Sequence, residues 1–322
     1  MNALQRFREL MEGAGYGGRV ATDVPMSRHT SFAVGGPADL LATARSLQEL
    51  VDWVRIANRT GIPYMVLGSG TNVLVSDRGI RGFVIINACQ RYTFGDDGVL
   101  EAESGCLFCE LAREAVERGW GGLEWGVGIP GTLGGAVVGN AGAYGGYIGD
   151  VLIDALLCHR DGHTARVSRD WLRYGYRASV LKREDLAGPR TVVLDARLQL
   201  MRADVRELRD RARQVTEQRL AHTPGGACAG STFMRTEQYP AGFLIEQAGL
   251  KGFRMGNAQV SDRHANFIMN AGGATAREIA ALIEYIQERV WRDFAQRLEP
   301  EVQFIGEWSD QVPVFPSSSG KA

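Results

Sequence analysis

The segment from Gly126 to Gly146 holds nine glycines and constrains this chain more than any other feature. Glycine loses more conformational entropy on folding than any other residue, so this density needs a physical reason. A close approach of the backbone to a large, flat cofactor with a pyrophosphate would supply one. Thr132 and Asn140 add polar groups for a ring or phosphate edge. A loop whose glycines serve packing alone is the alternative.

Three of these glycines fit a dinucleotide fingerprint by letter, since Gly126, Gly128 and Gly131 match G-x-G-x-x-G. The fingerprint needs a strand before it and a helix inside a βαβ unit. Glu124-Trp125 is predicted as only a weak strand, and no such unit surrounds it. We therefore predict that the match is accidental.

A second small-residue loop, Leu67-Gly68-Ser69-Gly70-Thr71-Asn72-Val73, follows a predicted strand at Tyr64–Leu67. Backbone N–H groups in such a loop can point inward and bind an anion. The loop lacks the Gly-Lys-Ser/Thr of a Walker motif. A plain tight turn is the alternative reading.

Local signals around these loops predict a mixture of helices and strands. Ser46 with Glu49 and Thr275 with Glu278 fit capping boxes at helix starts, and Gly61 fits a helix end. Asp161-Gly162 predicts a hairpin turn between strands at 151–159 and 164–167. Residues 204–221 are charged, lack glycine and proline, and predict a helix leading into a last domain.

Composition excludes several classes of protein. Thirty-six basic and 37 acidic residues give a net charge of −1, so no general attraction to nucleic acid or anionic lipid is expected. No signal peptide or stretch of about 20 apolar residues is evident, which predicts a cytoplasmic protein without a membrane anchor. Five cysteines at irregular spacing make a disulfide framework unlikely. The C-x-x-C of Cys106 and Cys109 is expected to be a pair of buried structural thiols, with redox chemistry or half a zinc site as the alternative. His159 and His163 flank a turn, so no metal site is expected.

Taken in order, the motifs resemble one known family. The segments 30–39, 67–73 and 128–145 resemble the FAD-binding part of the UDP-N-acetylenolpyruvoylglucosamine reductases, of the vanillyl-alcohol-oxidase flavoprotein class. Residues 174–179, 230–233 and 298–302 resemble later motifs of that family, and residues 248–252 and 259–261 also fit. The resemblance runs from about residue 22 to 307.

The resemblance implies an α+β chain with an FAD-binding PCMH-type fold of two subdomains, followed by a C-terminal α+β substrate domain. The expected domains are 1–78 and 79–205 for FAD, 206–308 for substrate, and a flexible tail at 309–322. FAD is expected to contact the following residues: Gly68, Ser69, Gly70, Thr71, Asn72, Val73, Gly128, Ile129, Pro130, Gly131, Thr132, Gly134, Gly135, Asn140, Ala141, Gly142 and Ala143.

The implied reaction is the NADPH-dependent, FAD-mediated reduction of the enolpyruvyl ether of UDP-N-acetylglucosamine, in peptidoglycan precursor synthesis. The implied catalytic residues are Arg177 on the substrate carboxylate, Ser231 as proton donor, and Glu301 as stabiliser or proton relay. Arg235, Lys251 and Gln259 are weaker candidates for substrate contacts. The partners are thus a nucleotide sugar and NADPH, with the oligomeric state unknown.

The sequence departs from the family at Met234-Arg235-Thr236, where a basic residue and Asn-Pro usually follow Phe233. Arg235 stands one position from the expected basic residue. The short stretch between Arg177 and Val192 lacks the tyrosine-bearing loop of one family branch, so the chain resembles the shorter branch. A flavin oxidase of the same class and a non-catalytic nucleotide-sugar sensor are the rival readings.

Overall fold

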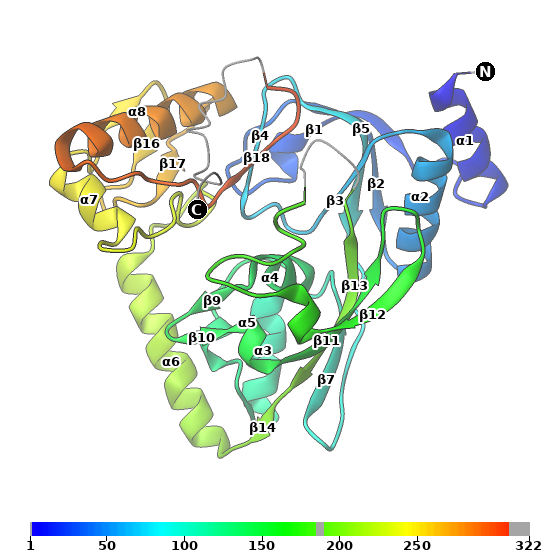
Figure 1. The fold of residues 1–322 in the computed structure, drawn as a ribbon, viewed down its shortest axis with the longest axis horizontal. Coiled ribbons are helices and arrows are strands. Elements are labelled where there is room, and N and C mark those ends of the chain that lie inside the picture. Colours follow the sequence, from blue (N-terminus) through cyan, green and yellow to red (C-terminus); the bar gives the residue numbers. More distant parts are fainter. Residues whose placement is uncertain (1, 185–189, 309–322) are drawn as a thin grey trace, which may run out of the picture. The chain divides into compact units, whose positions relative to one another are not determined.

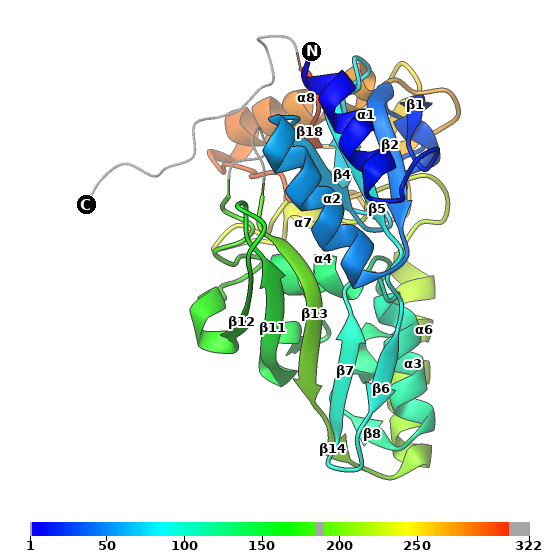
Figure 2. The same cartoon turned by 90° about the vertical axis from the view of Figure 1, so that its right-hand side faces the viewer.

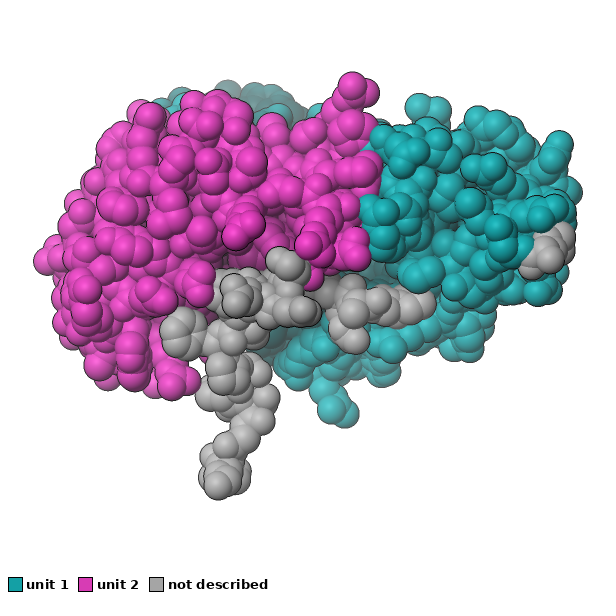
Figure 3. All heavy atoms as spheres, turned by 90° about the horizontal axis from the view of Figure 1, so that it is seen from above, with its two compact units in different colours: residues 1–24, 38–70, 81–222 teal, residues 25–37, 71–80, 223–322 magenta. Residues whose placement is uncertain are grey.

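The computed structural model describes residues 2–184 and 190–308. Within this part, the chain forms two compact units (Figure 3). Unit 1 comprises residues 1–24, 38–70 and 81–222, and unit 2 comprises residues 25–37, 71–80 and 223–322. The predicted domain boundary at residue 206 falls at the start of helix α6 (Val205–His222), and unit 1 continues through this helix. The predicted tail at 309–322 lies outside the described residues.

The first sheet of unit 1 has the strand order β1-β2-β5-β3. Its strands are β1 (Ala21–Pro25), β2 (Pro37–Ala44), β5 (Ile80–Asn87) and β3 (Tyr64–Leu67). Helices α1 (Ala3–Gly13) and α2 (Leu47–Thr60) cover one face (Figure 2). The buried ring of Phe83 lies 5.0 Å from that of Phe7 and 6.0 Å from that of Trp53, which fixes both helices on the sheet. Helix α1 was not predicted.

Both predicted helix caps are present, with one difference in detail. Ser46 Oγ accepts a hydrogen bond from the Glu49 N–H, and Gly61 ends α2 in a left-handed conformation. The Glu49 carboxylate, however, accepts from the N–H of Arg45 rather than from that of Ser46. The box at helix α8 (Ala276–Phe294) is complete, because Thr275 and Glu278 each accept from the other's backbone N–H.

The second sheet of unit 1 has the order β12-β11-β13-β7-β6. Its strands are β12 (Thr164–Ser168), β11 (Leu152–Cys158), β13 (Val192–Gln199), β7 (Val99–Glu103) and β6 (Tyr92–Phe94). Strands β11 and β12 pair antiparallel around Asp161-Gly162, which confirms the predicted hairpin. Helices α3 (Phe108–Glu117), α4 (Leu133–Gly139) and the predicted α6 belong to the same unit. Helix α4 packs against β13 and β7, and α3 packs against α6 (Figure 1).

Short elements complete unit 1: β8 (Trp120–Gly121) with β14 (Met201–Arg202), β9 (Gly142–Ala143) with β10 (Gly146–Tyr147), α5 (Ile148–Val151), and the 3-10 helices η2 (Glu124–Gly126) and η3 (Arg169–Leu172). The prediction of a strand at Glu124-Trp125 is wrong. Both side chains bond back to Gly122: the Glu124 carboxylate accepts from its N–H at 2.7 Å and Trp125 Nε1 donates to its carbonyl at 2.8 Å. These local bonds favour a tight turn over an extended strand.

Unit 2 combines a three-stranded sheet, two helices and a parallel strand pair. The elements are η1 (Met26–Arg28), β15 (Arg254–Met255), β16 (Ala258–Val260), β17 (Ile268–Asn270), α7 (Ala241–Gln247), α8, and the pair β4 (Val73–Val75) with β18 (Gln303–Ile305). The apolar stripe of α8 is buried against β15 and β16. Among residues 2–184 and 190–308, none of the helices has both the length and the apolar character needed to span a membrane.

The thiols give a direct test of this packing. All five cysteines are free, and Cys89, Cys106 and Cys158 are buried. Burial raises the pKa of Cys89 and Cys106 to about 12 and that of Cys158 to about 11. Because the thiolate is the reactive form, we expect the folded protein to show at most two fast-reacting thiols, at Cys109 and Cys228.

Titration with a disulfide reagent at mildly alkaline pH measures this number. The same titration in denaturant should count all five cysteines. Three or more fast-reacting thiols in the folded protein would contradict a structural role for the buried cysteines and would favour a redox role for Cys106.

Candidate active site

The small-residue loop at residues 67–73 joins β3 to β4 and offers backbone donors. Gly70 adopts a left-handed conformation with φ 61°. Within the described residues, the backbone N–H groups of Ser69, Gly70 and Thr71 form no hydrogen bond. Backbone donors of this kind need a partner, and an anion is the partner that a small-residue loop accommodates. The loop therefore has the donors that its predicted contact with a pyrophosphate requires.

The two glycine segments pack directly on one another inside unit 1. A Cβ atom on Gly68 would lie 2.4 Å from Thr132 Oγ1 and 2.8 Å from Thr132 Cγ2. Such distances are far below van der Waals contact, so only glycine fits at position 68. Gly68 thus permits close packing between two segments of the protein itself.

We expect Gly68→Ala to lower the free energy of unfolding by about 1–3 kcal/mol, the usual cost of overpacking, and to weaken FAD binding. Chemical denaturation and FAD titration of the apoprotein measure the two effects. Gly139→Ala is the matched control, because no atom lies within 4 Å of a Cβ built there. Equal stability of the two variants would contradict the close packing, and Thr132→Ala in the Gly68→Ala background should restore part of the loss.

Helix α4 lies within the glycine segment 126–146, and the polar side chains at its two ends already form hydrogen bonds within the protein. Thr132 Oγ1 accepts from the Gly135 N–H at 3.4 Å as the N-cap. Asn140, left-handed at φ 44°, donates from Nδ2 to the Gly175 carbonyl and accepts at Oδ1 from the Gly149 N–H, both at 3.0 Å. Both side chains are buried. They fix the helix and its neighbours, and the Thr132 carbonyl and the Asn140 N–H are engaged as well, by the Ala136 N–H and the Val137 carbonyl.

The remaining predicted cofactor residues lie on either side of this helix. Gly131, at φ 114°, precedes it and accepts at its carbonyl from the Phe108 N–H at 3.0 Å. Gly142 and Ala143 form β9 after it, and a Cβ on Gly142 would lie 2.2 Å from the Tyr147 ring. Within the segment, Gly135 is exposed and a Cβ there meets nothing closer than 3.7 Å.

Arg177 lies on a tight turn anchored to the end of α4. Tyr174 Oη donates to the Val137 carbonyl at 2.8 Å and Ser179 Oγ donates to the Val138 carbonyl at 2.6 Å. Between them Gly175 and Ala178 pair with each other, and Arg177 takes a positive φ of 52°. A non-glycine residue in this region is strained, and such strain is concentrated at functional sites.

Unit 2 brings Ser231 and Glu301 together through their neighbours. The Glu301 N–H donates to the Thr232 carbonyl at 2.8 Å, and Phe233 pairs with Pro300. Asn72 Nδ2 donates to the Glu301 carbonyl at 3.2 Å, and the Asn72 carbonyl accepts from Gln303. Residues 72, 231–233 and 301, far apart in sequence, thus form one cluster.

Asn266 holds this cluster and was missed by the sequence analysis. Its side chain accepts from the Phe233 N–H at 3.0 Å and donates to the Phe233 carbonyl at 2.9 Å, while its own carbonyl accepts from Thr232 at 2.7 Å. Asn266 is buried, so these bonds fix the backbone beside Ser231. A lone asparagine in one sequence gives no signal for such a role.

The three weaker substrate candidates are exposed or partly buried residues of unit 2. Lys251 pairs with Glu246 at 3.1 Å, and Gln259 bonds to Arg254 and Asp262. Arg235 is exposed. Among the residues described, no hydrogen bond links these three side chains to Ser231. No group of three or more His, Cys, Asp or Glu side chains within the described ranges is arranged to hold a metal ion.

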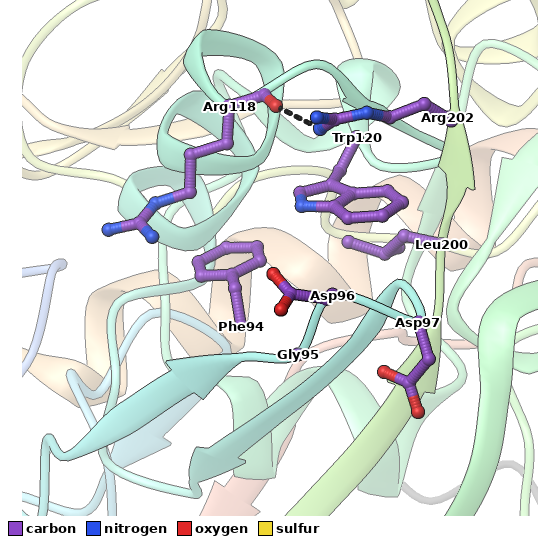
Figure 4. Close-up of a pocket in the computed structure, with 8 residues that line it drawn as sticks. All are labelled: Phe94, Gly95, Asp96, Asp97, Arg118, Trp120, Leu200 and Arg202. Atoms are coloured by element: carbon purple, nitrogen blue, oxygen red, sulfur yellow. Dashed lines mark hydrogen bonds between the residues drawn. The ribbon is translucent and has the colours of Figure 1, made fainter.

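An open hollow of about 660 Å³ in unit 1 contains none of the predicted residues (Figure 4). Its arginines stack on its aromatic rings: Arg118 lies 4.8 Å from the Phe94 centroid and Arg202 lies 4.6 Å from that of Trp120. Arg202 Nη1 also donates to the Arg118 carbonyl at 2.8 Å. These stacking contacts and the hydrogen bond account for the arginines and aromatic rings that line the hollow.

Comparisons with known proteins identify two family models in the chain. A family model described as an FAD binding domain matches residues 38–168, and one for the C-terminal domain of UDP-N-acetylenolpyruvoylglucosamine reductase matches residues 218–305.

Individual relatives cover nearly the whole chain. The reductase of this name from Alkaliphilus oremlandii is 39% identical over 294 residues, 89% of this chain and 94% of the relative. That from Synechococcus is 41% identical over 298 residues, 92% of this chain and 94% of the relative. The crystal structure of the reductase from Thermus caldophilus aligns with a TM-score of 0.75 at 34% identity, covering 89% of this chain and 99% of that one. The predicted resemblance and fold class are confirmed, and the chain belongs to the UDP-N-acetylenolpyruvoylglucosamine reductase family.

Proposed function

We propose that the protein reduces UDP-N-acetylglucosamine enolpyruvate to UDP-N-acetylmuramate, with FAD as bound cofactor and NADPH as electron source, in peptidoglycan precursor synthesis. The observation that carries this proposal is the cluster of Ser231, Glu301 and Asn72 held by the 2.8 Å bond from the Glu301 N–H to the Thr232 carbonyl. The cluster supports the proposal because its backbone bonds join the segments that carry a hydroxyl and a carboxylate, the two groups that proton delivery would use.

The residues present fit FAD. The N–H groups of Ser69, Gly70 and Thr71, which have no partner within the described residues, suit its pyrophosphate. The segment from Gly128 to Ala143 supplies a backbone with few side chains beside α4. When bound, FAD supplies the hydride carrier that links NADPH to the substrate.

Arg177 would bind the substrate carboxylate. Hydride addition to the terminal carbon of the enolpyruvyl group places negative charge on the conjugated carboxylate. A guanidinium fork donates two parallel hydrogen bonds to such a group and stabilises the charge as it forms. The turn from Gly175 to Ala178, tied to α4 by Tyr174 and Ser179, holds the backbone of Arg177 for this task.

Ser231 would then donate its proton to the carbon adjacent to the new C–H bond. A serine hydroxyl is a weak acid, so the strongly basic carbanion must drive this transfer. Glu301 would stabilise the same intermediate or return a proton to Ser231. Its backbone is fixed by Thr232 and Asn72, which keeps its position relative to Ser231 constant.

An anaerobic spectrum of the purified protein tests the proposal. NADPH should bleach the visible flavin band, and the enolpyruvyl nucleotide should restore it. Rapid restoration by oxygen, with none by the nucleotide, would instead favour a flavin oxidase. A protein that takes up no FAD would overturn the reductase reading and leave a nucleotide-sugar sensor.

A further inference from the structure

Arg219 lies on the face of α6 that packs against the core of unit 1. Leu208 is buried, and Ala212 and Val215 pack on the same core cluster. Arg219 continues this series at helical spacing, four residues after Val215. A guanidinium therefore follows three apolar side chains on the inward stripe of an otherwise charged helix.

Three of the four other arginines of α6 form ion pairs. Arg209 pairs with Glu117, Arg211 with Glu124 at 3.3 Å, and Arg213 with Asp210 at 2.7 Å. Within residues 2–184 and 190–308, Arg219 forms no ion pair and no side-chain hydrogen bond. Charge pairing on the helix surface thus accounts for those three arginines and not for Arg219.

The surroundings of Arg219 are the glycine segment and a second arginine. A Cβ built on Gly128 would lie 2.5 Å from Arg219 Cδ and 2.9 Å from Nε, so the Arg219 side chain lies directly against the Gly128 backbone. Burial lowers the pKa of Arg219, the charge of Arg177 lowers it further, and Tyr144 opposes both. A partly buried guanidinium beside another positive charge is costly unless an anion meets it.

We propose that Arg219 is a ligand-binding residue that donates hydrogen bonds to a phosphate or carboxylate oxygen of a nucleotide bound at the Gly128 backbone. The proposal rests on the proposed function, which supplies two such nucleotides: FAD and the enolpyruvyl nucleotide sugar. Both carry a pyrophosphate, and the sugar nucleotide also carries the carboxylate. The planar fork of arginine suits each of these oxyanions.

The test measures binding rather than turnover. FAD is titrated into the apoprotein by the quenching of flavin fluorescence, and the enolpyruvyl nucleotide is titrated into the oxidised holoenzyme without NADPH, so that no turnover occurs. Arg219→Met keeps the aliphatic stem and removes the charge, and Arg219→Lys keeps the charge and removes the fork. Arg213→Met is the matched control, because Arg213 is exposed on the same helix and pairs with Asp210.

We expect Arg219→Met to lower the affinity for one of the two ligands about 10- to 100-fold, in line with the loss of a charged hydrogen bond. The affinity of Arg219→Lys should be intermediate, and that of Arg213→Met should equal the wild type. Loss in the FAD titration assigns the oxyanion to the cofactor, and loss in the second titration assigns it to the substrate. The ligand-free Arg219→Met protein should unfold at the same temperature as the wild type or higher.

Both affinities remaining within about twofold of the wild type would overturn the proposal, and so would a fall in stability without a fall in affinity. A wild type that binds FAD but not the enolpyruvyl nucleotide would count against the proposed function alone. The FAD titration would still decide the role of Arg219.

Discussion

Ser231→Ala is expected to lower turnover by about 10²- to 10⁴-fold, the usual contribution of a positioned proton donor, without slowing the reduction of the flavin by NADPH. The hydroxyl acts only after hydride has reached the substrate, so the first half-reaction does not need it. Anaerobic stopped-flow absorbance separates the two halves: bleaching by NADPH should match the wild type, and recovery on adding the enolpyruvyl nucleotide should be slow.

A structural role for Ser231 would give a different result. Within the described part of unit 2, Ser231 Oγ forms no hydrogen bond, so its removal should leave the thermal unfolding temperature unchanged. Ser231→Cys retains an acidic proton and should recover part of the second half-reaction. A wild-type rate of flavin reoxidation by substrate in Ser231→Ala would remove Ser231 from the chemistry.

The sequence predicted elements whose signals are local. Thr275 and Glu278 satisfy each other's backbone N–H groups three residues apart, and Gly61 supplies a left-handed residue at a helix end. Each interaction is complete within a few residues, so one sequence suffices to predict it. The same reasoning failed at Glu124-Trp125, because two bonds to Gly122 decide that turn and composition does not show them.

The geometry of the candidate site depends on contacts that join distant segments. Strand β4 pairs in parallel with β18, so that Val73 aligns with Gln303, and Asn266 holds Phe233 by two side-chain bonds. Nothing local in either segment predicts these pairings. The family resemblance supplied Ser231 and Glu301 as candidates, and the structure adds the backbone bond that joins their segments.

The glycine segment shows how one signal can have two causes. Its density predicted close approach by a cofactor, but Gly142 is required by Tyr147 of the protein itself, as Gly68 of the other loop is by Thr132. The Arg219 side chain fills the space beside Gly128. Counting glycines therefore locates a crowded region, and only the contacts show which partner crowds each position.

Arg177→Gly is expected to lower turnover at least about 100-fold while leaving a more stable protein than Arg177→Ala. Both variants lose the guanidinium that would stabilise the developing charge, a loss that costs about 10²–10³ for a single donor. They differ in the backbone. Alanine at φ 52° retains a left-handed strain of about 1–2 kcal/mol. Glycine removes this strain, but it raises the conformational entropy of the unfolded chain, which lowers the stability by about 0.4–1 kcal/mol. Arg177→Gly should thus be more stable by about 0.8 kcal/mol at the middle of these ranges, and by at most about 1.6 kcal/mol.

Arg173 provides the matched control, because it too has a positive φ, at 46°, and is exposed at the end of η3. The change from alanine to glycine at position 173 should give a similar gain in unfolding free energy, measured by chemical denaturation, with turnover unchanged in both variants. Comparable losses of turnover at 173 and 177 would show that backbone conformation, rather than the guanidinium, limits the reaction. A loss at 177 alone, alongside equal stability gains, would mean that strain is held at this turn to present a charged group to the substrate.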